Sequence, residues 1–336
     1  MISLLSLLLL LVAVAFFTLL ERKVLAYIML RKGPNKPTLT GTLVPFADAL
    51  KLLTKPRLFP IAARPTLIVI SCFLSFVIPG MLWLFVVTPS PTTHYFRSLL
   101  CILIWMSLSV YALLAAGWGS NSKYSTLGAT RCIAQCISYE VCLTLLLLGF
   151  CLFTSFDLLG YHVHWGALLY CHLFLIMFLV VLAETNRSPF DFAEGESELV
   201  SGYNVEYSGS LFVILFLAEY LSILFMSYLV GSIGTSSSYY SAILCCAALA
   251  FTIIWCRGTL PRFRYDQLIA LSWKSLLPIT LSSFILLLLL YYPTYQLWKQ
   301  SHRTVMHHCH AHVFHRIVRP SFCPDFLLQP KPRDTP

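Results

Sequence analysis

Eight apolar segments, each long enough to cross a lipid bilayer, are the feature that most constrains the fold of this chain. A transmembrane helix needs about 20 predominantly apolar residues at a rise of about 1.5 Å each. The candidate spans are 2–20, 66–88, 98–118, 132–154, 165–183, 208–231, 239–256 and 275–295. Only 11% of the 336 residues are charged and 58% are hydrophobic, whereas a soluble domain carries roughly 25% charged residues. The sequence therefore predicts an all-α, polytopic membrane helix bundle of about eight transmembrane helices, over residues 1–298.

The first apolar segment is expected to be a retained span rather than a signal peptide. It lacks a basic n-region, and no small-residue cleavage site separates it from Glu21-Arg22-Lys23. No Arg-rich amphipathic transit peptide precedes it either. If the protein works in an organelle, we expect it to be made there.

Basic residues lie almost entirely on one predicted face of the membrane. Sixteen Lys and Arg residues fall in the segments 21–65, 119–131, 184–207 and 257–274, whereas the even-numbered loops contribute Arg97 alone. By the positive-inside rule the odd-numbered loops face the cytoplasm or matrix, and both termini lie opposite. This bias explains most of the net charge of +9, so we expect no nucleic-acid partner. The twelve cysteines form no CxxC pair, and neither a disulfide nor a metal site is assigned.

The segment 42–58 is too short and polar to span a membrane. Its apolar and charged residues fall on different sides of a helix: Leu43, Phe46, Ala47 and Leu50 against Asp48, Lys51 and Lys55. Thr42 is the expected N-cap and Pro56 the expected stop. Two interpretations stay open: an amphipathic helix at the membrane surface, or a loop helix packed on the bundle.

The tail 299–336 changes character, with six histidines, many prolines and no hydrophobic periodicity. A His/Cys metal site around Cys309 is one interpretation. Because ligand spacing is irregular, we expect a disordered, basic, His-rich extension.

Two carboxylates lie inside predicted spans. Glu219 lies roughly 16 Å and Glu140 roughly 12 Å into their helices, counted at the α-helical rise. A carboxylate at the bilayer centre costs about 2.5–3.5 kcal/mol, and such residues usually mark ion or proton routes. The alternative is a neutral carboxyl that serves helix packing. With two such acids in one bundle, we expect a proton path.

The loop 184–207 is acidic where a basic loop is normal. It contains Glu184, Asp191, Glu194, Glu196, Glu198 and Glu206 against the single base Arg187. A helix over 194–198 would place Glu194 and Glu198 side by side, and crowded carboxylates raise one another's pKa toward neutrality. The alternative is a solvated acidic loop. Its glycines and aromatic residues, among them Tyr203 and Tyr207, favour packed structure.

Motifs for redox cofactors and for nucleotides are missing from the sequence. It has no paired histidines at haem-ligand spacing within the spans, no cysteine cluster for iron–sulfur, no phosphate-binding glycine loop and no nucleophile elbow. If the chain serves a redox enzyme, we expect the electrons to move through other chains.

Four ordered groups of polar residues resemble the chain 1 family of NADH–ubiquinone oxidoreductase, the membrane subunits of respiratory complex I. They are Glu21-Arg22-Lys23 with Arg31-Lys32-Gly33-Pro34-Asn35 and Ala47-Asp48-Ala49-Leu50-Lys51-Leu52; Gly117-Trp118 with Ser120-Asn121-Ser122-Lys123-Tyr124, Gln135 and Ser138-Tyr139-Glu140; Ala183-Glu184-Thr185-Asn186-Arg187 through Glu194-Gly195-Glu196-Ser197-Glu198 to Glu206-Tyr207 and Ala218-Glu219-Tyr220; and Pro261-Arg262-Phe263-Arg264-Tyr265-Asp266-Gln267 with Trp273-Lys274. The resemblance covers residues 1 to about 298. The tail has no recognised counterpart in this family.

The resemblance implies a subunit that contributes to a ubiquinone channel and to a proton path in the mitochondrial inner membrane, with odd-numbered loops on the matrix side and both termini in the intermembrane space. The path residues it implies are Glu140, Glu184, Asp191, Glu194, Glu196, Glu198, Glu206 and Glu219; Glu21, Arg22, Asp48 and Lys51 would lie near the quinone. Ubiquinone would be the substrate, with FMN and iron–sulfur clusters on partner subunits of the complex.

Two positions depart from the family pattern. Pro56-Arg57 stands where an acidic residue commonly follows the lysine, and Ala26 replaces a usual glycine. The first departure removes one member of the acidic path.

Three other functions would fit parts of the sequence. A stand-alone proton-coupled transporter usually shows an internal repeat, which we do not find. The membrane subunit of a related hydrogenase is disfavoured by the third group of residues, which resembles the mitochondrial form. A purely structural anchor for a soluble enzyme predicts that glutamine replacements of the buried acids are silent.

Overall fold

The computed structural model describes residues 2–38, 40–87, 95–153, 171–192, 202–234 and 239–289, and these residues form helices without any strand. Six helices are long and apolar enough to span a membrane, and two shorter apolar helices, His172–Glu184 and Ile243–Thr259, accompany them over the described residues. Each of the eight predicted spans overlaps one of these helices. The helices are α1 (Ile2–Ile28), α2 (Val44–Thr54), α3 (Pro65–Val87), α4 (Tyr95–Ser120), α5 (Lys123–Phe153), α7 (Cys171–Glu184), α9 (Ser210–Gly234), α10 (Tyr239–Thr259) and α11 (Tyr265–Ala270). The prediction of an all-α membrane helix bundle is confirmed.

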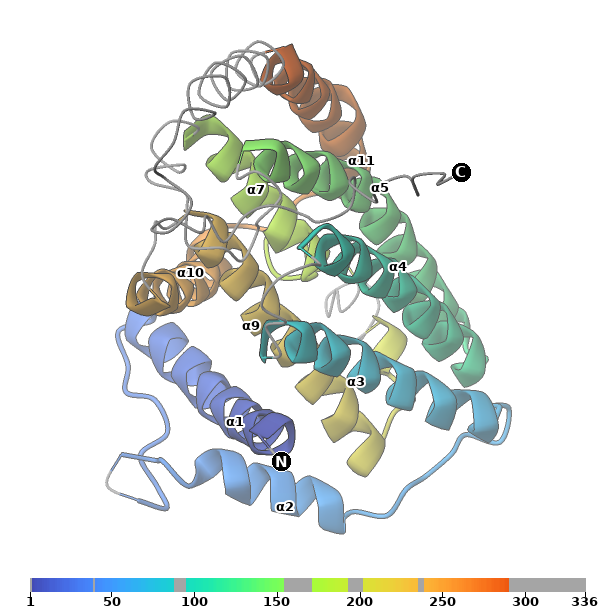
Figure 1. Cartoon of the computed structure of the whole chain (residues 1–336). Helices are drawn as coiled ribbons and strands as arrows, with labels where there is room; N and C mark the ends of the chain where they lie inside the picture. Colours follow the sequence, from blue (N-terminus) through green and yellow to red (C-terminus); the bar gives the residue numbers. More distant parts are fainter. Residues whose placement is uncertain are drawn as a thin grey trace, which may run out of the picture.

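Helix α9 runs through the middle of the bundle (Figure 1). It packs against α1, α3, α7 and α10. Helix α4 packs against α3 and also against α5. Ile223 and Phe225 of α9 are each 1% exposed, and a helix that is apolar all round belongs in an interior. The central position of α9 therefore carries Glu219 into the bundle rather than to its rim.

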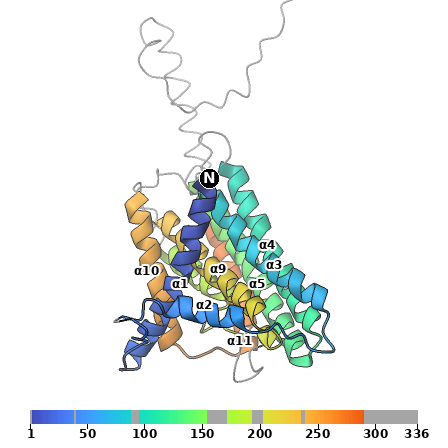
Figure 2. The same cartoon turned by 90° about the horizontal axis from the view of Figure 1, so that it is seen from below.

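Helix α2 lies across the outside of α1 and α9 (Figure 2). The Phe46 ring packs edge-on against the Phe16 ring of α1 at 6.0 Å, yet Leu50 and Leu53 remain exposed. Elements of both earlier interpretations are therefore present, because one side packs on the bundle and an apolar side faces outward. The predicted N-cap is wrong: the cap position is Leu43, with no side-chain hydrogen bond, and the Thr42 N–H instead donates to Thr38 Oγ1. The helix ends at Thr54, just before Pro56.

Helix α1 continues past its predicted end at residue 20. Glu21, Arg22 and Lys23, which the sequence placed in a loop, belong to the helix, which ends at Ile28. Arg22 Nη1 contacts Asp48 Oδ2 of α2 at 2.5 Å, while Glu21 is only 4% exposed. Two neighbouring charged residues therefore point in different directions: Arg22 lies outside the bundle and Glu21 lies inside it.

The last described span, Tyr265–Leu289, contains a π-helical segment, η2 (Leu271–Leu276). Just before it, the carbonyl of Leu268 accepts a hydrogen bond from the buried Tyr139 hydroxyl of α5 at 3.1 Å. Leu268 itself is fully buried. This contact fastens the final span to α5 beside Glu140.

Gly209, the residue before α9, lies close to the backbone at the end of α2. It has a φ of +57°, and a Cβ there would lie 3.1 Å from the Lys55 carbonyl oxygen and 3.4 Å from the Pro56 carbonyl oxygen. Next to it, the Ser208 hydroxyl accepts from the Leu58 N–H and donates to the Leu58 carbonyl, at 3.0 and 3.1 Å. The carboxyl end of α2 is thereby held against α9.

We expect Gly209→Ala to destabilise the protein by about 1–2 kcal/mol, the cost of an L-residue in the left-handed region, because the added methyl also meets the Lys55 carbonyl. The measurement is the thermal unfolding midpoint of the chain in mild detergent. The matched control is Gly80→Ala in α3, where a Cβ meets nothing within 4 Å. That change should leave the midpoint equal or slightly higher, because alanine favours helix. Equal midpoints for the Gly209 variant and the native protein would contradict the prediction.

Candidate functional site

A cavity of about 130 Å³ lies between α3, α4, α5 and α9, and the turn that follows α7 also lines it. One water molecule needs roughly 10–15 Å³ of such space, so several can fit. Polar side chains line it together with apolar ones: Ser75, Ser109, Glu184, Thr185, Asn186, Arg187, Tyr203, Glu219 and Ser222. The cavity therefore combines two acids that the sequence singled out with room for water.

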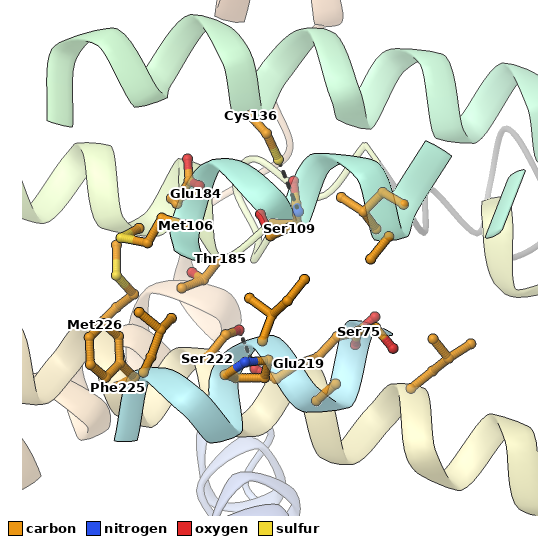
Figure 3. A pocket seen from close by; sticks show the side chains of 18 of the residues that line it. Ser75, Met106, Ser109, Cys136, Glu184, Thr185, Glu219, Ser222, Phe225 and Met226 are labelled. Carbon is orange, nitrogen blue, oxygen red and sulfur yellow. Dashed lines mark hydrogen bonds between the residues drawn. The ribbon is translucent and has the colours of Figure 1, made fainter. Parts of the chain in front are cut away.

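One side of the cavity is formed by α5 and the end of α7 (Figure 3). Glu184 is the last residue of α7, and its Oε2 is buried without a hydrogen-bond partner among the described residues. Next to it, Asn186 Nδ2 donates to Cys136 Sγ at 3.8 Å. Asn186 has a φ of +50°, a conformation in which asparagine is tolerated better than most residues. The turn thus keeps the Glu184 carboxyl at the cavity wall.

Gln135 of α5 holds that turn in place. Its Nε2 donates to the carbonyl oxygens of Ala183 and Phe190, at 2.7 and 2.9 Å, and the side chain is fully buried. Both ends of the turn are therefore fastened to α5 by one amide group.

Glu219 and Ser222 of α9 lie on the opposite side of the cavity (Figure 3). The Tyr203 hydroxyl donates to Glu219 Oε1. Tyr203 belongs to the short 3-10 helix η1 (Gly202–Asn204), which lies against α5 so closely that a Cβ on Gly128 would be 3.0 Å from the Gly202 Cα. The missing side chain of Gly128 allows this approach, which brings the tyrosine within reach of the carboxyl.

Proline shapes the α3 wall. Pro79 has no N–H to donate to the carbonyl of Ser75 four residues earlier, and both residues line the cavity. A helix carbonyl beside the cavity is thereby left for another donor, such as water.

Glu21 forms a second charged centre next to this cavity. Its Oε1 accepts from Arg187 Nη1 at 3.2 Å and from Arg257 Nη1 of α10, and its Oε2 accepts from the Tyr220 hydroxyl at 2.6 Å. The Arg187 guanidinium also lies 4.6 Å from the centre of the Tyr220 ring. Four elements (α1, the turn after α7, α9 and α10) thus meet at one buried carboxylate.

Arg187 is 8% exposed. Burial by itself lowers the pKa of its guanidinium, but Glu21, Tyr220 and Glu219 beside it raise that pKa above its ordinary value. The side chain therefore stays charged at every physiological pH.

The other predicted path residues are placed less directly. Glu140 is half-buried on α5 and does not line the cavity, although it interacts electrostatically with Glu184. Asp191 is buried and pairs with Arg262 at 3.5 Å. Glu206 is half-buried just before α9. The structure therefore brings Glu184 and Glu219 together at one cavity, whereas Glu140, Asp191 and Glu206 do not line it.

Several predictions lie outside the described residues: those on Glu194, Glu196 and Glu198, including the pairing of Glu194 with Glu198, and those on the tail 299–336. The described part of the acidic loop is packed rather than solvated, since Tyr203 and Tyr207 are buried. Of the four residues expected near a quinone, Arg22 and Asp48 pair, Lys51 is exposed, and Glu21 belongs to the interior centre. Over the described residues no cluster of three metal-ligating side chains occurs, and their cysteines are free thiols.

Sequence reasoning missed most partners of the acids. Tyr220 and Cys136 carried no signal of their own, because a tyrosine or cysteine in an apolar helix usually serves packing. Tyr203 indicated packed structure but not its contact with Glu219, and Arg257 was counted only as one of the basic loop residues. Arg187 did carry a signal, as the one base in an acidic loop. Its contact with Glu21 spans 166 residues of sequence, which a pattern in one sequence does not reveal.

We expect Gln135→Leu to loosen the turn that carries Glu184. Two hydrogen bonds worth about 0.5–1.5 kcal/mol each are lost, so amide hydrogens in 185–192 should exchange with deuterium roughly tenfold faster. The control is Ser138→Ala, which removes only a bond from a side chain to its own helix, at 2.8 Å. Unchanged exchange in the Gln135 variant would mean that the turn is held by other contacts.

Comparison with known proteins agrees with this architecture. A sequence model of the family described as NADH dehydrogenase matches residues 2–288. The chain is 47% identical over 287 residues to NADH-ubiquinone oxidoreductase chain 1 of Aedes aegypti, which covers 83% of this chain and 92% of the relative. It is 48% identical over 281 residues to the protein of that name from Artemia franciscana, covering 81% and 92%. It is 45% identical over 294 residues to the protein of that name from Strongylocentrotus purpuratus, covering 83% and 91%. The chain therefore belongs to the NADH dehydrogenase family, among proteins named NADH-ubiquinone oxidoreductase chain 1.

Proposed function

We propose that this chain is the membrane subunit of respiratory complex I that carries a carboxylate path for protons and forms part of the ubiquinone channel. One observation supports the proton path above all others. Glu184 at the end of α7 and Glu219 of α9 lie on opposite sides of one cavity with room for several waters (Figure 3). Carboxyl groups and water inside an apolar bundle are the components of a proton relay.

The path would run from Glu184 through the cavity to Glu219, with Glu140 as its neighbour on α5. Asp191, Glu206 and the acids Glu194, Glu196 and Glu198 would supply protons from the loop. Tyr203 donates to Glu219, so the acceptor carboxyl is already oriented. Crowded carboxyls respond to a nearby change of charge by taking up or releasing protons, which would couple the path to quinone reduction.

The quinone side of the proposal rests on α1 and α2. The Arg22–Asp48 pair joins the two helices, and α2 presents exposed Leu50 and Leu53 beside it. An apolar wall with a charged rim suits a long prenyl chain that carries a polar headgroup. Ubiquinone would be the substrate, while FMN and iron–sulfur clusters would lie on partner subunits and supply the electrons.

The proposed location is the mitochondrial inner membrane, with odd-numbered loops in the matrix and both termini in the intermembrane space. Large apolar side chains on the outside of the described bundle, such as Leu9, Phe73 and Leu244, are 63%, 67% and 74% exposed. Lipid and neighbouring membrane subunits would cover them.

Glu219→Gln and Glu140→Gln should impair coupled turnover in the assembled complex. We expect proton pumping to fall by roughly 100-fold for Glu219, at the low end of the contribution of a positioned acid–base group. NADH oxidation with a water-soluble acceptor should continue, because the electron entrance lies on other subunits. The measurement is proton uptake per NADH in proteoliposomes.

The matched control is Asp266→Asn, an acid that is 77% exposed and pairs with Arg264 at 3.6 Å. Its pumping should equal that of the native enzyme. Native pumping in both glutamine variants would support a purely structural anchor instead. Proton transport by the purified chain alone would support a stand-alone transporter.

The sidedness has its own test at Lys123, which is exposed at the start of α5. A membrane-impermeant amine reagent should modify Lys123 only in inside-out inner-membrane vesicles, because the positive-inside rule puts this loop in the matrix. Modification from the outer face of right-side-out vesicles would reverse the proposed orientation.

A further inference from the structure

Arg187 lies in the wall between two cavities. One is the cavity that holds Glu184 and Glu219, and the other is a small one between Glu21, Arg257 and apolar residues of α1, α9 and α10. Arg187 lines both. Its side chain is 10% exposed, and its Nη2 has no hydrogen-bond partner among the described residues.

The two positive charges at this wall exceed the single negative charge of Glu21. Glu21 carries one negative charge and faces two guanidinium groups, Arg187 and Arg257, together with the Tyr220 hydroxyl. A buried positive charge without a counter-charge is costly. Glu21 can keep Arg257 as its counter-ion, so Arg187 has one charge to offer to another acid.

Glu219 is the acid on the other side of the wall. Arg187 interacts electrostatically with it, and Tyr220, whose ring faces the Arg187 guanidinium, is its neighbour in sequence. When Glu219 is ionised, two carboxylates balance two guanidiniums. When Glu219 is protonated, one positive charge is left over.

We propose that Arg187 is the shared counter-ion of Glu21 and Glu219, so that the charge on one of these acids sets how readily the other loses its proton. The inference rests on the proposed proton path and adds to it a positioning residue and an electrostatic link to the α1 side of the bundle. Arg187 itself never needs to transfer a proton. Because Arg187 lies between the two cavities, its charge couples the protonation of Glu219 to the charge of Glu21.

The groups that face Glu219 come from several elements. The turn after α7 contributes Arg187 and Asp191, and η1 contributes Tyr203 and Asn204. Glu184 lies across the cavity, while Glu21 and Arg257 lie behind Arg187. Of these groups, Arg187 is the cation that lies between the two acids.

Two substitutions should act on Glu219 in opposite directions. Without Arg187, ionised Glu219 loses its counter-charge, so the proton should be held to higher pH. Without the Glu21 charge, Arg187 is left to Glu219 alone, so the proton should be lost at lower pH. A residue that only supports packing would give no such opposition of sign.

The experiment is an infrared pH titration of protonated carboxyl groups in the purified, assembled complex. The band that disappears in Glu219→Gln is the band of Glu219. In Arg187→Gln we expect its midpoint to rise by roughly one pH unit, and in Glu21→Gln to fall, the size usual for one neighbouring charge. Arg264→Gln, at an ion pair that is 80% exposed on the arginine side, is the matched control and should move nothing.

Shifts of the same sign in both variants, or no shift in either, would overturn the inference. If Arg187→Gln fails to assemble, Arg187→Lys keeps the charge while losing the planar group that reaches both acids, and a smaller rise is expected. If neither arginine variant assembles, Glu21→Gln decides alone, because a fall supports the link and an unmoved band refutes it.

The proposed function and this inference fail separately. Normal pumping by Glu219→Gln together with opposite shifts would refute the proton path and leave the shared counter-ion standing. Lost pumping together with unmoved bands would do the reverse.

Discussion

The cost of placing a charge in apolar surroundings governs how this bundle is put together. Glu21 is nearly inaccessible to solvent, and its two oxygens are satisfied by Arg187, Arg257 and Tyr220. A buried carboxylate that loses such partners is strongly destabilising, so α1, α9, α10 and the turn after α7 must come together at this point. The same requirement places Arg187 at the wall of the cavity that holds Glu219. The structural ion pair and the candidate site therefore share one side chain.

Much of the architecture follows from the sequence because the bilayer imposes simple lengths. Apolar segments of about 20 residues can only be helices in such surroundings, and every predicted span overlaps a helix among the described residues. The cost of a carboxylate inside a span made Glu219 stand out, and the acidity of the loop 184–207 drew attention to Glu184; these two acids share a cavity. Pro56 correctly marked the end of α2. These predictions succeed because each depends on local chemistry.

Predictions that depend on the direction in which a side chain points, or on a partner far away in sequence, were less successful. Glu21 was placed in a loop because it opens a charged run, yet α1 continues since Arg22 pairs outward with Asp48 while Glu21 pairs inward. Depth along a helix does not say which way a side chain points, so Glu140 looked equivalent to Glu219 but does not line the cavity. The Thr42 cap failed because the helix begins at Val44 with Leu43 at the cap position, while the Thr42 hydroxyl lies 3.1 Å from the Thr38 hydroxyl. Each error concerns a partner that spacing alone does not specify.

The π-helical segment Leu271–Leu276 bears on how this span can change in length. A π-bulge accommodates one more residue than the α-helical turn it replaces. Loss of a single residue within it can be absorbed by reversion to a regular α-turn, so that 277–289 keep their orientation toward α5. The same loss elsewhere in the helix would rotate everything beyond it by roughly 100°, the angle between successive residues, and turn Leu287 away from Gly149, where it packs. Deletions in this span are therefore tolerated best beside Tyr139.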